Sequence, residues 1–221
     1  QSRRLAKDNL VISVVGDIRG GSLGKLIDLV FGSLPEKASP WKLEEFSPNT
    51  GNRTIVIEKP IPQSIIRFGQ AGIRRSDSDF FAAYIVNYVL GGGGFGSRLY
   101  TEVREKRGLA YSIYSYLSPF KHSGVIIGGA GTANGRVAET IKILKKEWRR
   151  MSDQGLNIKE LNDAKLYLSG SYSIRFSSSL RIARIMTGIQ LERLGIDYID
   201  KRNRLINDVS LQSVNRVAKK L

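Results

Sequence analysis

The chain has 221 residues, of which 41% are hydrophobic and 25% are charged, a composition typical of a soluble globular protein of one domain or slightly more. It contains no cysteine and only one histidine, which excludes disulfides, thiolate chemistry and a two-histidine zinc site held by this chain. The net charge of +15 would attract anionic partners, and no apolar run approaches the roughly 18 residues of a membrane span.

The N-terminal part of the chain predicts one strand and one helix. An apolar run at residues 9–18, closed by Gly16 and Asp17, is typical of a buried strand. Apolar residues then recur every three or four positions, which predicts a short helix ending before Pro35. Residues 35–52 hold three prolines and are interpreted as an interdomain linker. Because neither an initiator methionine nor a signal peptide is present, we expect the chain to be a fragment.

Two strands and a helix are predicted after the linker. Residues 53–59 and 63–73 have the strand pattern and are separated by prolines. Ser76 and Asp79 resemble a capping box, with Asp in place of the usual Glu or Gln, and so predict the start of a helix. The apolar face of this helix is expected to contain five residues: Phe81, Tyr84, Ile85, Tyr88 and Val89.

A second helix is predicted directly after a glycine-rich run. Ser97 can cap this helix, which extends to about Arg107, and Gly108 supplies the left-handed residue that ends it. Residues 110–120 and 123–133 are then expected to pair as antiparallel strands.

The remaining chain is predicted to be helical. One helix of about 15 residues follows from apolar residues spaced by four and three: Val137, Ile141, Leu144, Trp148 and Met151. From Lys159 onward the helical pattern is interrupted near residues 176–179, 195–197 and 208–210. Strands followed by helices indicate an α+β fold, with a mainly antiparallel sheet covered by helices on one face.

The glycine run at Gly91–Gly94, followed by Phe95, does not match a nucleotide-binding loop. A phosphate loop would need a lysine that is missing here, and a dinucleotide fingerprint would follow a strand instead of a helix. A plain turn between two helices should need only one glycine. The run therefore favours a functional loop that hinges or lies close to another chain.

Arg104 and Tyr111 are the candidate catalytic residues. The helix is expected to reverse into a strand between them, which can bring both side chains to the same edge. A guanidinium and a phenol are donors suited to a carbonyl oxygen or to the oxyanion formed from it. Considered alone, Arg104 could equally cap helix carbonyls and Tyr111 could be a half-buried strand aromatic.

Residues 90–111 resemble the second homologous domain of the insulinase (pitrilysin) family of zinc metallopeptidases, closest to the bacterial and mitochondrial processing peptidase-like group. Their glycine-rich turn precedes SRLYTEVREKRGLAY, which matches the family pattern without a gap. The N-terminal strand and helix resemble the close of the preceding domain, and the helices from Leu156 onward resemble the C-terminal helical layer. The resemblance thus covers nearly the whole chain and divides it into three parts: residues 1–34, the linker 35–52 and the domain 53–221.

The resemblance implies a peptidase built from two halves. The H-x-x-E-H zinc site belongs to the other half, so this chain is expected to hold no cofactor and to be inactive alone. Arg104 and Tyr111 match the pair that binds the substrate carbonyl and the tetrahedral intermediate, and Gly91–Gly94 with Phe95 match a mobile substrate-binding loop. The expected partners are a peptide and a zinc-bearing homologous domain or subunit, in a homo- or heterodimer of the bacterial cytoplasm or periplasm.

Two alternatives of different kinds stay open. Relatives without catalysis serve as scaffold subunits in respiratory complexes, although a pure scaffold has no need of both Arg104 and Tyr111. A basic nucleic-acid-binding module is the other alternative, but the positive residues are spread along several helices instead of forming one basic patch, which does not favour it. His122, between two predicted strands, is interpreted as a solvated turn residue.

Overall fold

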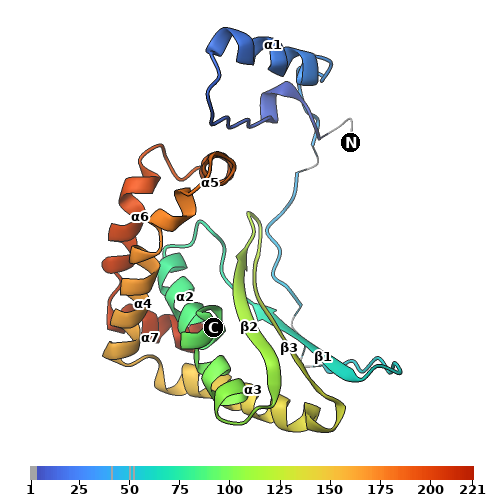
Figure 1. The fold of residues 1–221 in the computed structure, drawn as a ribbon, viewed down its shortest axis with the longest axis vertical. Coiled ribbons are helices and arrows are strands. Elements are labelled where there is room, and N and C mark those ends of the chain that lie inside the picture. Colours follow the sequence, from blue (N-terminus) through green and yellow to red (C-terminus); the bar gives the residue numbers. More distant parts are fainter. Residues whose placement is uncertain (1–3, 41, 50, 52) are drawn as a thin grey trace. The chain divides into compact units, whose positions relative to one another are not determined.

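The computed structural model describes residues 4–40, 42–49, 51 and 53–221, so positions 41, 50 and 52 of the predicted linker lie outside the described residues (Figure 1). The chain forms two compact units. One contains the residues up to Glu44 together with Gly170–Lys201, and the other contains Glu45–Ser169 together with Arg202–Leu221. Within the described ranges, no helix is both long enough and apolar enough to cross a membrane.

The first unit is helical. Its elements are the 3₁₀ turn η1 (Lys7–Asn9), α1 (Gly20–Phe31), the 3₁₀ turn η6 (Ser173–Phe176) and α5 (Ser179–Leu191). Helix α1 confirms the short predicted helix. The predicted strand at residues 9–18 is wrong, since these residues follow η1 without regular structure and Val14 is exposed. A strand needs a neighbour for its backbone hydrogen bonds, and the described part of this unit contains none.

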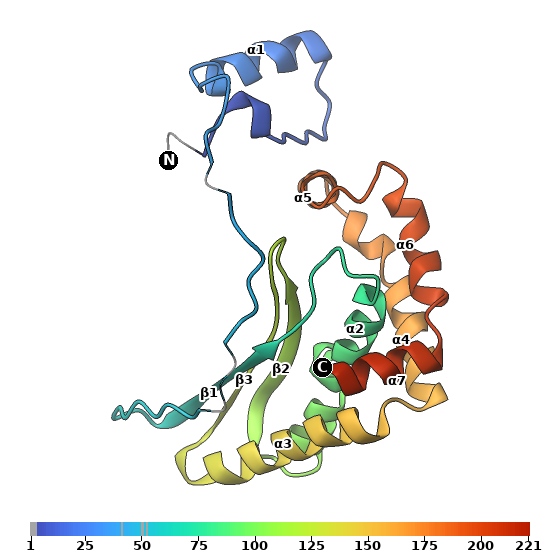
Figure 2. The same ribbon diagram turned by 180° about the vertical axis from the view of Figure 1, so that it is seen from behind.

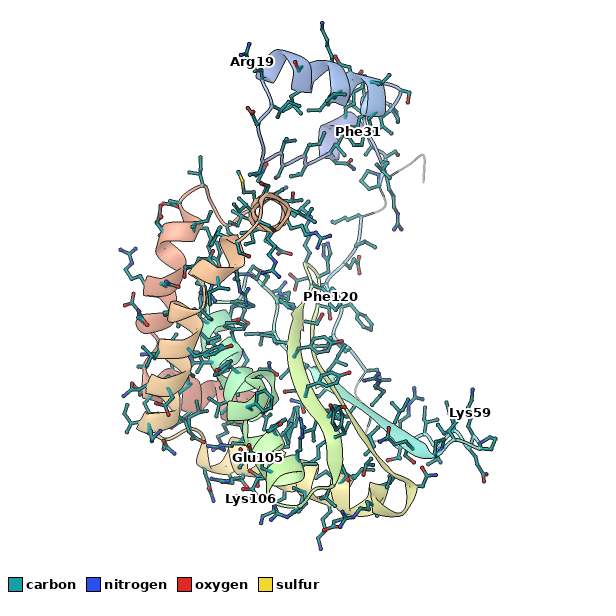
Figure 3. The ribbon with its side chains drawn as sticks, in the orientation of Figure 1. Arg19, Phe31, Lys59, Glu105, Lys106 and Phe120 are labelled. Atoms are coloured by element: carbon teal, nitrogen blue, oxygen red, sulfur yellow. The ribbon has the colours of Figure 1, made fainter. Side chains whose placement is uncertain are left out.

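The second unit contains a three-stranded antiparallel sheet with the order β1-β3-β2. The strands are β1 (Gln63–Ala71), β2 (Ala110–Pro119) and β3 (Gly124–Ala133), close to the predicted segments. Strands β2 and β3 form a hairpin whose turn contains Phe120 and His122 (Figure 3). Glycines supply four of the ten residues of β3, which leaves the middle of the sheet with few side chains.

The predicted strand at residues 53–59 is also wrong. These residues are extended but unpaired, and Ile55, Val56 and Ile57 are exposed. The connection to β1 contains Pro60 and Pro62, which have no N–H to donate and a fixed φ, so it does not make the tight turn of a hairpin. A groove of about 660 Å³ lies between this segment and β1 instead.

Helices cover one face of the sheet, as Figures 1 and 2 show. Across this face the ring of Phe68 in β1 meets that of Trp148 edge-on, with 5.5 Å between their centroids. The α+β fold with a helix-covered antiparallel sheet is therefore confirmed. The helical elements of this unit are α2 (Phe80–Asn87), η2 (Tyr88–Gly92), η3 (Gly94–Gly96), η4 (Tyr100–Glu105), η5 (Asn134–Arg136), α3 (Val137–Gln154), α4 (Ile158–Gly170), α6 (Tyr198–Asn207, from Arg202 on) and α7 (Leu211–Lys220).

The start of α2 differs from the predicted capping box. Asp79 occupies the N-cap position but makes no side-chain cap hydrogen bond. Its carboxylate instead accepts two hydrogen bonds from Arg216 of α7, at 2.9 and 2.5 Å. Asp77 accepts the hydrogen bond of the Asp79 N–H at 2.8 Å. The predicted capping box, with Ser76 as the cap and Asp79 as its partner, is therefore wrong: Asp79 itself stands at the N-cap, and its side chain forms a tertiary ion pair.

A buried ion pair joins the helix that begins at Arg98 to α4. The Arg98 guanidinium donates to both carboxylate oxygens of Glu160 at 2.7 Å each, and to the carbonyl oxygen of Gly155 at 2.7 Å. Burial raises the pKa of Glu160, but the hydrogen bonds from Arg98 and from the Asn157 backbone outweigh this effect and leave the pKa below its ordinary value of 4.5. The pair therefore remains ionised at neutral pH.

Replacing Arg98 by alanine should lower the free energy of unfolding by about 3 kcal/mol, because Glu160 is left partly buried without its counter-ion. Urea denaturation of the two proteins measures the difference. Lys159→Ala is the control, since it removes an exposed ion pair with Asp163 on the same helix and should change little. Equal effects of the two substitutions would contradict a structural role for the buried pair.

The Glu160 pair should also make stability depend on pH. Because its folded-state pKa is lowered, its contribution is present above pH 4.5 and is lost as the pH falls through the folded-state value. The wild type should therefore lose stability on acidification more steeply than Glu160→Gln, which has no carboxyl group to protonate. Thermal unfolding at a series of pH values from neutral to acidic measures both slopes, and parallel curves would refute the assignment.

Candidate functional site

Ser97 fixes the junction between the glycine run and the following helix. Its hydroxyl donates to the carbonyl oxygen of Gly94 at 2.8 Å and accepts the N–H of Tyr100 at 3.4 Å. The predicted cap is therefore confirmed. The helix runs from Arg98 through the π-helical element η4, and Gly108 follows with φ of +57°, as predicted for the residue that ends it. Glu105 and Lys106 mark this end in Figure 3.

The first three glycines of the run pack against their own chain. A Cβ on Gly91 would lie 2.5 Å from Ser115 Oγ and 2.9 Å from its backbone nitrogen. A Cβ on Gly92 would lie 2.6 Å from Asn87 Nδ2, and one on Gly93 would lie 2.8 Å from a carbonyl oxygen of η2. Ser115 in turn donates to Asn87 Oδ1 at 2.9 Å, so the glycines lie on a buried polar contact between α2 and β2.

The fourth position requires glycine because of its backbone conformation. Gly94 has φ of +56° with open space around it, a conformation that other residues adopt only with strain. The argument that a plain turn would need only one glycine is therefore wrong, because three positions require the absence of a side chain and the fourth requires a left-handed backbone. Phe95, at the tip, is 75% exposed.

The Arg104 guanidinium contacts two tyrosine rings. Its central carbon is 4.9 Å from the ring centroid of Tyr100 and 4.8 Å from that of Tyr111. Tyr100 is buried and also meets the ring of Phe95, with 4.9 Å between centroids. The sequence-predicted pair, Arg104 and Tyr111, is thus brought together, and a continuous row of contacts links it to the exposed Phe95.

The neighbouring basic residues are neutralised, whereas Arg104 is not. Lys106 and Arg107 each lie 2.6 Å from a carboxylate oxygen of Glu102. The hydrogen bond from Lys106 lowers the pKa of Glu102 below 4.5, against burial, which raises it. Among the residues that the structure describes, no carboxylate forms an ion pair with Arg104. Its N–H groups therefore keep their capacity for an external acceptor.

Tyr111 is presented outward by an irregularity in the sheet. Ala110 pairs with Thr132 and Ser112 pairs with Gly131, so Tyr111 falls at a break in the register of β2. Such a bulge changes the direction of the side chain. Tyr111 is 77% exposed, and its ring rests on the Arg104 guanidinium.

Sequence reasoning missed two residues of this arrangement. Tyr100 precedes Arg104 by four residues on one helix, and this spacing is itself a signal for contact. Arg98 belongs to the same motif, but its partner Glu160 is 62 residues away, so no local signal marks it. Arg98 supports the helix that carries Arg104 and makes no contact with the candidate pair.

The described residues do not form a zinc site. The sequence offers one histidine and no cysteine. Within the described parts of the chain, no three histidine, aspartate or glutamate side chains are grouped as metal ligands. His122 lies in the β2–β3 turn, where its carbonyl oxygen accepts the N–H of Phe46 at 2.9 Å. What the site offers is hydrogen-bond donors.

A family model described as the peptidase M16 inactive domain matches residues 2–168. An uncharacterized zinc protease of Streptomyces coelicolor is 32% identical over 74% of this chain and 37% of its own length. A protein of Helicobacter pylori described as a non-peptidase homolog is 26% identical over 95% of this chain and 48% of its own length. The chain thus spans about half, or less, of these curated relatives.

A solved structure has the same fold. The peptidase M16 inactive domain from Pseudomonas fluorescens superimposes with a TM-score of 0.77 at 29% sequence identity. The match covers 93% of this chain and 48% of that one. The similarity therefore extends over nearly all of the present chain and about half of the longer protein.

Gly91→Ala should lower the free energy of unfolding by about 1–3 kcal/mol, because its Cβ would press on the backbone and hydroxyl of Ser115. Gly96→Ala is the matched control, since a Cβ there meets nothing within 4 Å. Chemical denaturation compares both variants with the wild type. If Gly91→Ala is as stable as Gly96→Ala, the close packing of the run on β2 is not what requires glycine.

Proposed function

The chain belongs to the M16 peptidase family as its inactive domain, and from this premise we propose that it is the non-zinc half of a zinc-dependent endopeptidase. In this proposal it closes over a bound peptide and donates hydrogen bonds to the reacting carbonyl from Arg104 and Tyr111. The observation that carries the proposal is the contact between these two side chains at an exposed edge of β2.

The chemistry of the pair suits acyl transfer. When a peptide carbonyl is attacked, negative charge develops on its oxygen, and donors already in position stabilise that charge most. Arg104 is held by contacts with two aromatic rings and by no carboxylate among the described residues, so that its N–H groups stay available. The exposed phenol of Tyr111 adds a neutral donor beside the cation. Neither group needs to gain or lose a proton to act in this way.

The metal is assigned to the other half. Because the described side chains do not form a zinc site, the ion and the attacking water are properties of a homologous zinc-bearing domain or subunit. The length of the curated relatives, about twice the matched span or more, leaves room for such a half in the same chain, but a separate subunit in a homo- or heterodimer fits equally.

The N-terminal part of the chain fits the same organisation. We propose that residues 1–34 close the preceding homologous domain, that 35–52 is the linker and that 53–221 is the inactive domain. Gly91–Gly94 and the exposed Phe95 are proposed to contact substrate, because Phe95 follows the glycines directly and its ring meets Tyr100, which in turn contacts Arg104.

A scaffold without catalysis is the second candidate function. It is favoured by the Helicobacter pylori relative, which is described as a non-peptidase homolog. In a scaffold the Arg104 and Tyr111 side chains would have no acceptor to bind. The two functions are therefore separated by whether these side chains affect turnover in the complete protein.

In the complete protein, Arg104→Ala and Tyr111→Phe should each reduce kcat for peptide hydrolysis by about 10²–10³-fold, as expected for loss of one oxyanion donor. Zinc content, measured by elemental analysis, should be unchanged. Arg149→Ala on α3 and Tyr167→Phe on α4 are control substitutions of the same kinds away from the site. This chain alone should show negligible hydrolysis, and wild-type turnover in both site variants would end the proposal.

A further inference from the structure

One face of the sheet is covered by helices, and the other carries a single charged side chain. Along β1, Ile66 and Phe68 pack into the core, so Ile65 and Arg67 point to the opposite face. Arg67 is the only charged residue in the three strands. Among the described residues no carboxylate is paired with it, and its only hydrogen bond is made to Tyr114.

The contact between Arg67 and Tyr114 crosses the central strand. Gly129 of β3 pairs with Arg67 on one side and with Tyr114 on the other. A Cβ on Gly129 would collide with Arg67 Nη1, so the glycine is what allows the guanidinium to lie across β3. Gly131, the next residue of this face, also adds no side chain, and the polar side chains of Gln63 and Ser112 flank it.

The pair presents two donors to one external group. Arg67 Nη1 donates to the Tyr114 hydroxyl, so the hydroxyl oxygen is used as the acceptor and its own hydrogen remains to be donated. The remaining guanidinium N–H groups lie beside it. The ring of Tyr116 stacks on that of Tyr114, with centroids 6.2 Å apart, and forms an apolar wall on one side. A planar cation next to a phenol O–H matches a single carboxylate group.

We propose that Arg67 and Tyr114 form a subsite for an acidic side chain of the peptide substrate. This subsite rests on the proposed function, because the peptide is the one held by Arg104 and Tyr111. The single charged residue of the three strands matches one carboxylate of a peptide, whereas a nucleic acid would need a row of positive charges. Tyr114 follows Tyr111 by three residues of β2, about 10 Å of strand, which corresponds to about three residues of an extended peptide.

The subsite is tested with the complete protein and a set of fluorogenic peptides. One glutamate, or a glutamine as its neutral counterpart, is moved through an otherwise uncharged sequence with an amidated C-terminus. At a position about three residues from the cleaved bond, glutamate should raise kcat/KM about fivefold over glutamine, a preference that weakens with added salt. Arg67→Gln should abolish this preference and Tyr114→Phe should reduce it, while the charge-matched Arg149→Gln should retain it.

The subsite and the proposed function fail in different ways. Arg104→Ala should slow all peptides alike and leave the glutamate preference intact. If peptides are cleaved with this dependence on Arg104 but the glutamate preference is absent, or survives Arg67→Gln, the subsite is wrong while the proposed function stands. If no peptide is cleaved, the dissociation constants of the same peptides, measured by fluorescence anisotropy, decide: an Arg67-dependent glutamate preference supports the subsite, and its absence overturns it.

Discussion

The guanidinium of Arg104, held against the rings of Tyr100 and Tyr111, is the contact on which the candidate site depends. An arginine can stack on aromatic rings through its faces and still donate hydrogen bonds through its edge. One ring comes from a helix and the other from the second residue of β2, and the reversal between them passes through the left-handed Gly108. The two ring contacts therefore link two elements and at the same time hold a cation that has no carboxylate partner among the described residues.

The surrounding structure keeps these elements rigid. The Arg98–Glu160 pair holds the start of the helix to α4, and the close packing of Gly91 on Ser115 holds the glycine run to β2. Glu102 binds the two basic neighbours that would otherwise compete with Arg104 for an anionic group. A site whose donors are fixed in advance loses little free energy in reorganisation when charge develops on the substrate. The fold is thus suited to supply positioned donors to a reaction whose metal lies elsewhere.

Much of the fold could be predicted from local patterns. The apolar spacing of Val137 to Met151 identified α3, and the alternating segments identified the strands of the sheet. The two wrong strands have the same local pattern, but a strand also depends on a neighbour, which is absent for residues 9–18 and for residues 53–59 in the described chain. The predicted capping box of Ser76 and Asp79 is wrong because Asp79 occupies the N-cap itself and its carboxylate is bound by Arg216, 137 residues away.

In the functional sites too, residues close in sequence could be predicted, whereas contacts between distant residues could not. Arg104 and Tyr111 are only seven residues apart and belong to one continuous motif, so the sequence alone indicated both of them. Arg67 and Tyr114 are 47 residues apart and meet only because the strand register places both beside Gly129. Contacts of this kind depend on how strands pair, and no spacing within the sequence indicates them.

The central claim is that this chain stabilises the tetrahedral intermediate through Arg104 and Tyr111. The most direct measurement is the affinity of the complete protein for a phosphonate peptide that mimics this intermediate, compared with the affinity for the matching uncleaved peptide. We expect Arg104→Ala and Tyr111→Phe to weaken phosphonate binding by about 100-fold, with little change in peptide binding. Equal affinity of wild type and both variants for the phosphonate would contradict the claim.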